Sequence, residues 1–190
     1  MGSKQKILQG LKRLLLLKGH RGYSVRALAK EAEVNHGLVH HYFGSKEGVV
    51  RALLAQITGE KLRQLVERIE AGAPEEFGEF FVDLWVKDEE FARLIYEFGQ
   101  LGRQFPAIGK IINEIAEKRR YFLTQVFELS EAQAMLFQAV IFGIQTLRQD
   151  LPIEQIRLAA EELFRIFPLD KKFNAKKLKA VMAATGAGQQ

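Results

Sequence analysis

Cysteine is absent from the 190-residue chain, so disulfide bonds and thiolate chemistry are excluded. No run of about 18 uninterrupted apolar residues exists, so no membrane span is expected. The N-terminal segment also lacks the apolar core of a signal peptide, because Lys12 and Arg13 interrupt it. We therefore expect a cytoplasmic protein.

Proline and threonine are scarce, with four residues of each. The prolines fall where a helical period begins or ends, and no alternation typical of strands lies between them. This pattern predicts an all-α fold. The expected helices span residues 4–19, 46–70, 75–86, 89–101, 107–128, 131–149 and 153–167, together with two short helices between residues 24 and 44.

Charge is unevenly distributed along the chain. Residues 1–60 carry ten Lys and Arg against four acidic residues, a formal charge of +6, whereas residues 61–168 carry −5 and residues 169–190 carry +4. A basic N-terminal block is typical of a head that binds a polyanion. The alternative is an ordinary solvated charged surface.

The stretch from Ser24 to Lys46 has the pattern of two short helices joined by a tight turn. Ser24 and Asn35 are suitable N-caps for the two helices, and Gly44 and Ser45 end the second helix. The apolar positions of the two helices would form a small shared core: Val25, Leu28, Ala29, Ala32, Val34, Val39, Tyr42 and Phe43.

The outer surface of the second helix contains no acidic residue. It consists of His36, Gly37, Leu38, His40 and His41. A compact surface of this kind suits the DNA major groove, which admits one α-helix. The alternative is a helical hairpin whose outer surface is merely solvated.

These residues resemble the helix-turn-helix of TetR-family transcriptional regulators. The matching positions are Ser24, Leu28, Ala29, Ala32, Val34, Gly37, Val39, Tyr42, Phe43 and Lys46. Glu33 departs from the family's usual glycine, and His40 departs from a common tyrosine. The resemblance implies an N-terminal three-helix DNA-binding domain, residues 1–47, followed by a helical-bundle ligand-binding and dimerisation domain, residues 48–168. Residues 169–190 are expected to form a basic, flexible tail.

The candidate DNA contacts divide into two groups. Ser24, Arg26, Tyr42 and Lys46 are expected to anchor phosphates, which fixes register without reading sequence. Asn35, His36, Gly37, Leu38, His40 and His41 are expected to contact base edges. Because helix-turn-helix proteins usually read two half-sites, we expect a near-palindromic double-stranded operator.

Aromatic residues are concentrated after residue 43, where thirteen of the fourteen phenylalanines lie. They could form an ordinary helical core or line an apolar cavity. The resemblance implies a pocket, so we expect a hydrophobic small-molecule ligand. The candidate ligand-binding residues are Phe81, Trp85, Phe91, Tyr96, Phe98, Phe122, Gln125, Phe137 and Phe142.

The last two expected helices suggest an association surface. Residues 131–149 are apolar almost all round, and residues 153–167 carry one apolar stripe. Both could pack inside one monomer, or they could form a four-helix bundle with a second copy. We expect a homodimer made by Phe137, Val140, Ile144, Ile156, Ala160, Leu163, Phe164 and Phe167.

Two other functions compete with DNA binding. His36 and His40 have a spacing that can hold a metal on one helix, but no nearby Asp, Glu or Cys completes the ligand set. No nucleophile motif, phosphate-binding loop or carboxylate pair stands out, so we expect no enzyme, metal or cofactor. A helical protein-interaction module without DNA binding would explain the association surface but not the basic head.

Overall fold

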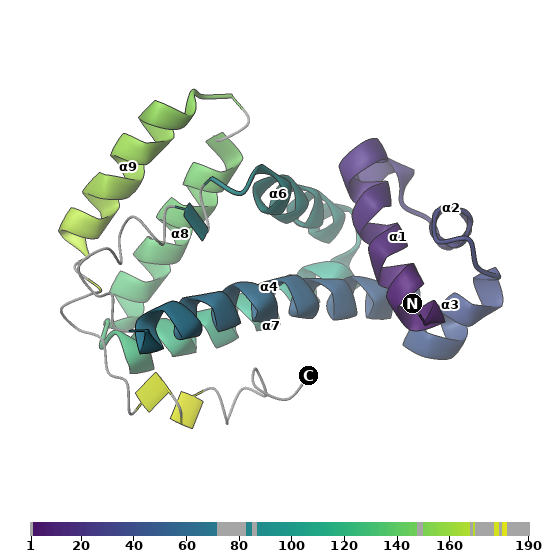
Figure 1. The fold of residues 1–190 in the computed structure, drawn as a ribbon, viewed down its shortest axis with the longest axis horizontal. Coiled ribbons are helices and arrows are strands. Elements are labelled where there is room, and N and C mark those ends of the chain that lie inside the picture. Colours follow the sequence, from purple (N-terminus) through teal and green to yellow (C-terminus); the bar gives the residue numbers. More distant parts are fainter. Residues whose placement is uncertain are drawn as a thin grey trace. The chain divides into compact units, whose positions relative to one another are not determined.

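The computed structural model describes residues 2–71, 83–84, 87–147, 150–167, 169, 177–178 and 180–181. Its regular elements are α-helices and one 3₁₀ turn, with no strand among the described residues, which confirms the all-α prediction (Figure 1). The elements are α1 (Ser3–Lys18), η1 (His20–Gly22), α2 (Val25–Glu31), α3 (His36–Phe43), α4 (Lys46–Glu70), α6 (Glu89–Gln104), α7 (Pro106–Val126), α8 (Glu131–Leu147) and α9 (Ile153–Ile166).

The helix boundaries follow the sequence pattern closely. α4 has the expected bounds, and α6 continues three residues beyond the expected end at residue 101. The helix expected at 75–86 lies outside the described residues apart from residues 83–84. No described helix is both long and apolar enough to cross a membrane.

The chain forms two compact units. The head unit contains Met1–Thr58 and Arg93–Asn113, and the body unit contains Gly59–Ala92 and Glu114–Gln190. α4, α6 and α7 therefore contribute residues to both units. The head unit carries thirteen Lys and Arg against four Glu, a formal charge of +9, whereas the body unit carries −4.

The core of the head unit is built by α1, α2 and α3. Leu11, Leu28 and Val39 are completely buried there. A Cβ atom at Gly10 would lie 2.7 Å from the Cβ of Ala32, so a glycine in α1 allows the close approach of the end of α2. This packing supports α3 from behind.

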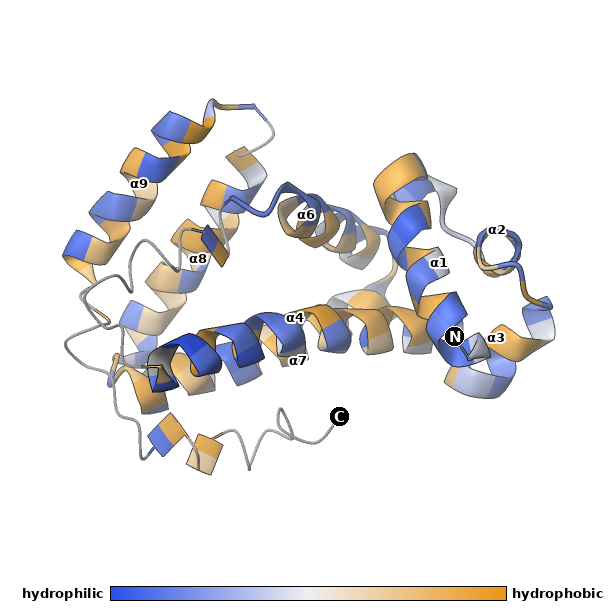
Figure 2. Ribbon diagram, viewed as in Figure 1, coloured by the Kyte–Doolittle hydropathy of each residue, from blue (hydrophilic) through white to orange (hydrophobic). Residues whose placement is uncertain are grey.

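α8 and α9 lie side by side in the body unit (Figure 1). The Phe137 ring of α8 packs edge-on against Phe164 and Phe167, with centroid distances of 6.2 and 5.9 Å. Apolar and polar residues alternate around α9, whereas apolar residues predominate along α8 (Figure 2). One side of each helix is therefore used within the unit.

Candidate nucleic-acid interface

α2 and the turn after it hold the first half of the motif. The Ser24 hydroxyl accepts a hydrogen bond from the Ala27 N–H at 3.1 Å, which confirms the expected N-cap. After α2 the chain turns at Glu33, whose φ is +54°, and the Val34 N–H donates to the Ala29 carbonyl. The position where the family pattern has glycine therefore adopts a left-handed backbone that favours glycine.

α3 presents one side to its own core and the other to solvent. The Asn35 side-chain oxygen accepts from the Gly37 N–H at 2.8 Å and caps the helix. Val39 is fully buried, and Leu38 is half-buried. The exposed residues of α3 and its N-cap are Asn35, His36, Gly37, His40, His41 and Tyr42. The expected base-contacting side chains are thus brought together on one accessible surface.

The side chains near the end of α3 have defined orientations. His40 Nδ1–H donates to the Gly44 carbonyl at 3.3 Å, because a carbonyl oxygen can only accept. In a neutral ring this leaves Nε2 of His40 as the acceptor. The His41 and Tyr42 rings meet edge to face at 5.0 Å, which holds both at the outer surface.

Lys46 opens α4, but its ammonium group contacts a ring of the head unit. Its Nζ atom lies 3.7 Å from the centroid of the Phe105 ring. The Lys46 carbonyl accepts from the Tyr23 hydroxyl at 2.6 Å, and burial, with the nearby Glu47 carboxylate, raises the pKa of Tyr23 above its usual range. For Lys46 to bind a phosphate, its ammonium group must leave the ring.

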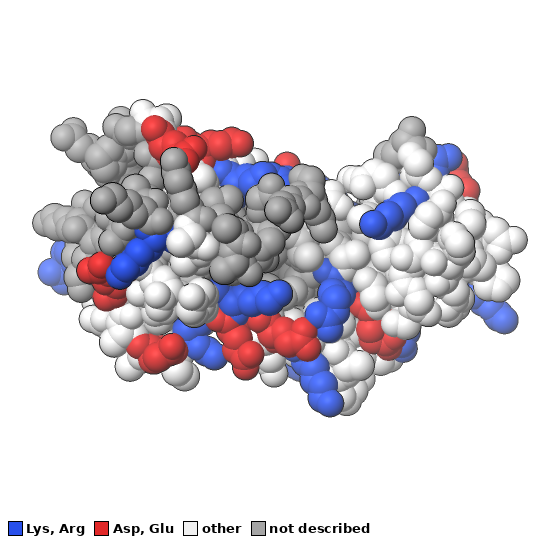
Figure 3. All heavy atoms as spheres, turned by 90° about the horizontal axis from the view of Figure 1, so that it is seen from below, with Lys and Arg blue, Asp and Glu red and all other residues white. Residues whose placement is uncertain are grey.

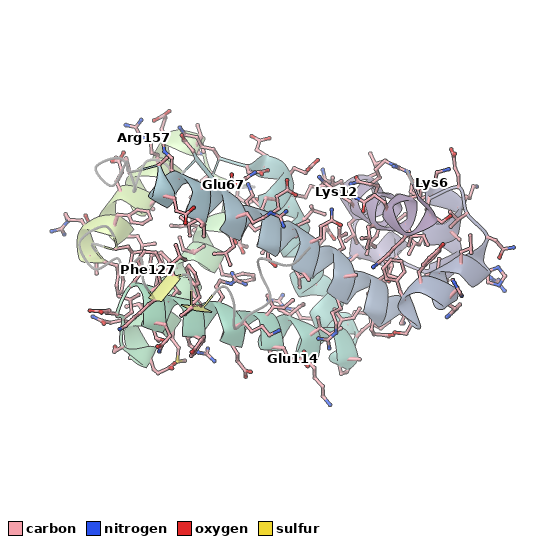
Figure 4. All side chains as sticks on the ribbon, turned by 60° about the horizontal axis from the view of Figure 1, so that its bottom comes forward. Lys6, Lys12, Glu67, Glu114, Phe127 and Arg157 are labelled. Carbon is pink, nitrogen blue, oxygen red and sulfur yellow. The ribbon has the colours of Figure 1, made fainter. Side chains whose placement is uncertain are left out.

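Other basic side chains lie on α1 and α2, the two helices that pack against α3. Arg26 is exposed, and Lys6 and Lys12 project from α1 (Figure 4). Arg13 is bound to Glu31 of α2 through a 3.0 Å ion pair. At the α1–α3 end of the view in Figure 3, most of the visible atoms belong to uncharged residues, and separate Lys, Arg, Asp and Glu side chains lie among them. Lys6, Lys12 and Arg26 add to the positive charge of the head unit.

The described members of the expected ligand-binding set are divided between the two units. Phe91, Phe122 and Phe137 are buried in the body unit, Gln125 is half-buried there, and Phe142 is 46% exposed. Tyr96 and Phe98 belong to the head unit, where Phe98 is buried. Phe81 and Trp85 lie outside the described residues.

The expected dimerisation residues largely face the interior of the body unit. Phe137, Ile144, Ile156, Ala160, Leu163 and Phe167 are buried, and Val140 and Phe164 are half-buried. A different apolar set is exposed on the same two helices. It comprises Met135, Leu136, Phe142 and Leu147 of α8 and Leu158 and Ile166 of α9, which we call the α8–α9 apolar surface. Most of the side chains that the sequence assigned to a partner are thus buried within one copy of the body unit.

The contacts of two residues in the head unit were not predicted from the sequence. Glu97 is a buried carboxylate that accepts hydrogen bonds from His20, and Phe105 is the ring beneath Lys46. The only sequence signal for Glu97 is an acidic residue three positions after Leu94 and four before Leu101, both apolar. Among the described residues, no group of three His, Asp or Glu side chains could hold a metal.

Comparisons with known proteins agree with this geometry. A model of the bacterial regulatory proteins of the tetR family matches residues 7–53. The HTH-type transcriptional repressor Rv3405c of Mycobacterium tuberculosis (strain ATCC 25618 / H37Rv) is 31% identical over 135 residues, covering 70% of this chain and 68% of that protein.

Solved structures give the same fold. A TetR transcription regulator from Haloarcula marismortui ATCC 43049 aligns with a TM-score of 0.66 and 17% identity, covering 90% of this chain and 98% of that one. The multidrug binding protein EbrR, complexed with imidazole, aligns with a TM-score of 0.64 and 26% identity over 86% of this chain and 95% of its own.

Proposed function

We propose that this chain, which belongs to the TetR family of DNA-binding transcriptional regulators and not to an enzyme family, is an operator-specific repressor. We propose further that a hydrophobic small molecule controls its binding to the operator. The observation that carries the proposal is the exposed, acid-free surface of α3 on a head unit of charge +9. The Mycobacterium tuberculosis relative is named a transcriptional repressor, which supports the direction of regulation. Since its target is DNA, we place the protein in the cytoplasm.

Base reading falls to α3. His36, His40 and His41 can donate to or accept from base edges, and Leu38 can contact a thymine methyl group. The Nδ1–H bond from His40 to Gly44 leaves Nε2 to accept from an exocyclic amino group of adenine or cytosine. Asn35 and Gly37 lie at the N-terminus of α3, where bases are approached first.

Phosphate contacts fix the position of α3 in the groove. Tyr42 is exposed on α3, Arg26 is exposed on α2, and Ser24 caps α2. Lys46 joins them when its ammonium group exchanges the Phe105 ring for a phosphate. Such contacts supply affinity that does not depend on sequence and falls as salt rises.

Two copies associate through the α8–α9 apolar surface. α8 is apolar on two sides, and the side that packs within the body unit leaves Met135, Leu136 and Phe142 exposed. Leu158 is 64% exposed and Ile166 58% exposed on α9. Several exposed apolar side chains on two neighbouring helices favour a protein–protein interface, and a C2 dimer would present two copies of α3.

The ligand is expected to be hydrophobic. Buried aromatic side chains of the body unit, Phe91, Phe122 and Phe137, provide flat apolar surface for it. The structurally similar protein EbrR is a multidrug binding protein, which supports this class of ligand. A ligand would act by favouring one existing conformation of α4, which runs about 37 Å as a single helix.

The proposal is tested by comparing a base-contact variant with a phosphate-contact variant. Duplexes are first selected from a random library with the wild-type protein. His40→Ala is expected to lose about 10-fold in affinity for the selected duplex and to relax its preference at one base pair. Arg26→Ala should weaken selected and scrambled duplexes equally and reduce the salt dependence. Equal behaviour of the two variants, or no enrichment by the wild type, would contradict the proposal.

A further inference from the structure

Glu97 places a carboxylate inside the head unit. Its side chain is on α6 and only 8% of the residue is exposed, although acidic residues are rarely buried without specific partners. Its Oε2 atom accepts from the backbone N–H of His20 at 2.6 Å and from His20 Nδ1–H at 2.8 Å. Both donors belong to the turn that follows α1, so this carboxylate joins α6 to the beginning of the helix-turn-helix.

The turn after α1 is shaped around that carboxylate. Gly19 has φ +65° and ψ −175°, a conformation that is essentially restricted to glycine. A Cβ atom at Gly19 would lie 3.2 Å from each carboxylate oxygen of Glu97. Glycine therefore serves both the backbone conformation and the close approach of Glu97, and η1 (His20–Gly22) begins at the carboxylate.

The same turn is connected to both ends of the helix-turn-helix. Tyr23 follows η1, is buried, and donates its hydroxyl to the Lys46 carbonyl at the start of α4. Ser24 then caps α2. The Lys46 ammonium group in turn lies over Phe105, eight residues after Glu97. Tyr23 and Lys46, which flank α2 and α3, are therefore bonded to each other, and they contact His20 and Phe105, respectively.

From this geometry we propose that Glu97 is a positioning residue for operator reading. It does not touch DNA. It holds the turn at residues 19–23 on α6 through two hydrogen bonds and thereby sets the orientation in which α3 is presented. Specific binding needs the base-reading side chains in register with the groove, whereas contacts to random duplex tolerate small rotations. Loss of the Glu97 contacts should therefore lower specificity more than general affinity for DNA.

The main experiment compares Glu97→Met with Glu90→Met. Both changes remove one negative charge from α6, but Glu90 is exposed at the start of the helix. Methionine keeps the length of the side chain and helix propensity while removing both acceptor oxygens. Dissociation constants are measured by fluorescence anisotropy on the selected duplex and on a scrambled duplex, at a temperature where circular dichroism shows every protein to be folded.

We expect Glu97→Met to bind the selected duplex at least 10-fold more weakly than Glu90→Met. The two variants should bind the scrambled duplex within twofold of each other. Glu97→Gln keeps an oxygen that can accept from His20, so it should retain most of the selectivity. A purely stabilising role for Glu97 predicts instead that both duplexes are affected by the same factor, and this result would overturn the inference.

His20→Ala supplies a second, milder test. It removes the ring contact but leaves the backbone N–H bond to Glu97, so selectivity should fall by about threefold to fivefold, and a second change at Glu97 should abolish the remainder. His20→Ala with wild-type selectivity would overturn the inference even if Glu97→Met failed to fold. Because the inference rests on operator binding, the wild type is the reference. No preference in the wild type would refute the proposed function itself, whereas a wild-type preference shared by both variants would refute only the role of Glu97.

Discussion

The backbone of Glu33 has a conformation that is unfavourable for a residue with a side chain. Its φ of +54° lies in the left-handed region, where a residue with a Cβ atom costs about 1 kcal/mol relative to glycine. The turn accepts this because the Glu33 N–H donates to the Lys30 carbonyl and the Val34 N–H donates to the Ala29 carbonyl, which fixes the backbone on both sides of Glu33. Glu33 is also exposed and is one of only four acidic residues in the head unit.

Glu33→Gly should therefore stabilise the protein and strengthen DNA binding. We expect a gain of about 0.5–1 kcal/mol in the free energy of unfolding, measured by urea denaturation. Removal of a negative charge near the DNA surface should also tighten binding to random duplex at low salt.

Glu128→Gly is the matched control, because Glu128 has a φ of +53° but lies in the body unit. It should alter stability without a change in DNA affinity. Glu33→Gln separates the charge from the backbone, since it should improve DNA binding alone. A destabilised Glu33→Gly protein would refute the strain at this turn.

The roles of some individual residues could be predicted from the sequence, and the roles of others could not. The caps at Ser24 and Asn35 and the exposure of the α3 histidines follow from local spacing, and the structure confirms them. Glu97 and Phe105 lie far along the chain from their partners His20 and Lys46. Their roles depend on tertiary packing, which no local pattern encodes.

At the scale of the element, the junction of α3 and α4 is built on a glycine. A Cβ atom at Gly48 would lie 2.0 Å from the Phe43 carbonyl oxygen, so no side chain fits there without a shift of the backbone. The Gly48 N–H donates to the Ser45 hydroxyl, which caps α4. Glycine is a weak helix former, but at this position in the first turn of α4 it lets the end of α3 pack directly against α4.

Gly48→Ala should destabilise the protein by about 2–3 kcal/mol, because the added methyl group must displace the end of α3. Thermal denaturation and specific DNA affinity would both report the change. Gly59→Ala on the same helix is the control. A Cβ atom at Gly59 would meet nothing within 4 Å, so this change should stabilise α4 by up to about 1 kcal/mol. Equal effects of the two substitutions would contradict the close approach at Gly48.

Helix bounds could be predicted because caps and hydrophobic period are local, as α4 shows. The element that covers each apolar stripe could not be predicted in this way. Ile156 and Leu163, on the apolar stripe of α9, are buried within a single copy of the body unit, although the sequence pattern also suited an association surface. Periodicity shows that a side of a helix is apolar, but only the fold decides whether α8 or a second copy covers it.

At the scale of the whole molecule, binding to two half-sites requires a dimer. Leu158→Glu places a charge on the α8–α9 apolar surface, where leucine is 64% exposed in a single copy. Burying that charge in an interface without a partner is costly, so we expect the dimer to dissociate at micromolar concentration. Light scattering coupled to size-exclusion chromatography measures the mass directly.

Leu17→Glu is the control for this change. Leu17 is 70% exposed on α1, in the head unit, so the charged substitution should leave the mass unchanged. A protein that remains dimeric after Leu158→Glu would place the association surface elsewhere.

We propose that two copies of the protein present α3 to two half-sites of one operator. Sequencing of duplexes selected from a random library by the wild-type protein tests it most directly. We predict an enriched near-palindrome whose half-site centres are separated by about 10–10.5 base pairs or a multiple of that spacing, lost with Leu158→Glu. Enrichment of a single isolated half-site, or of no sequence at all, would contradict the account.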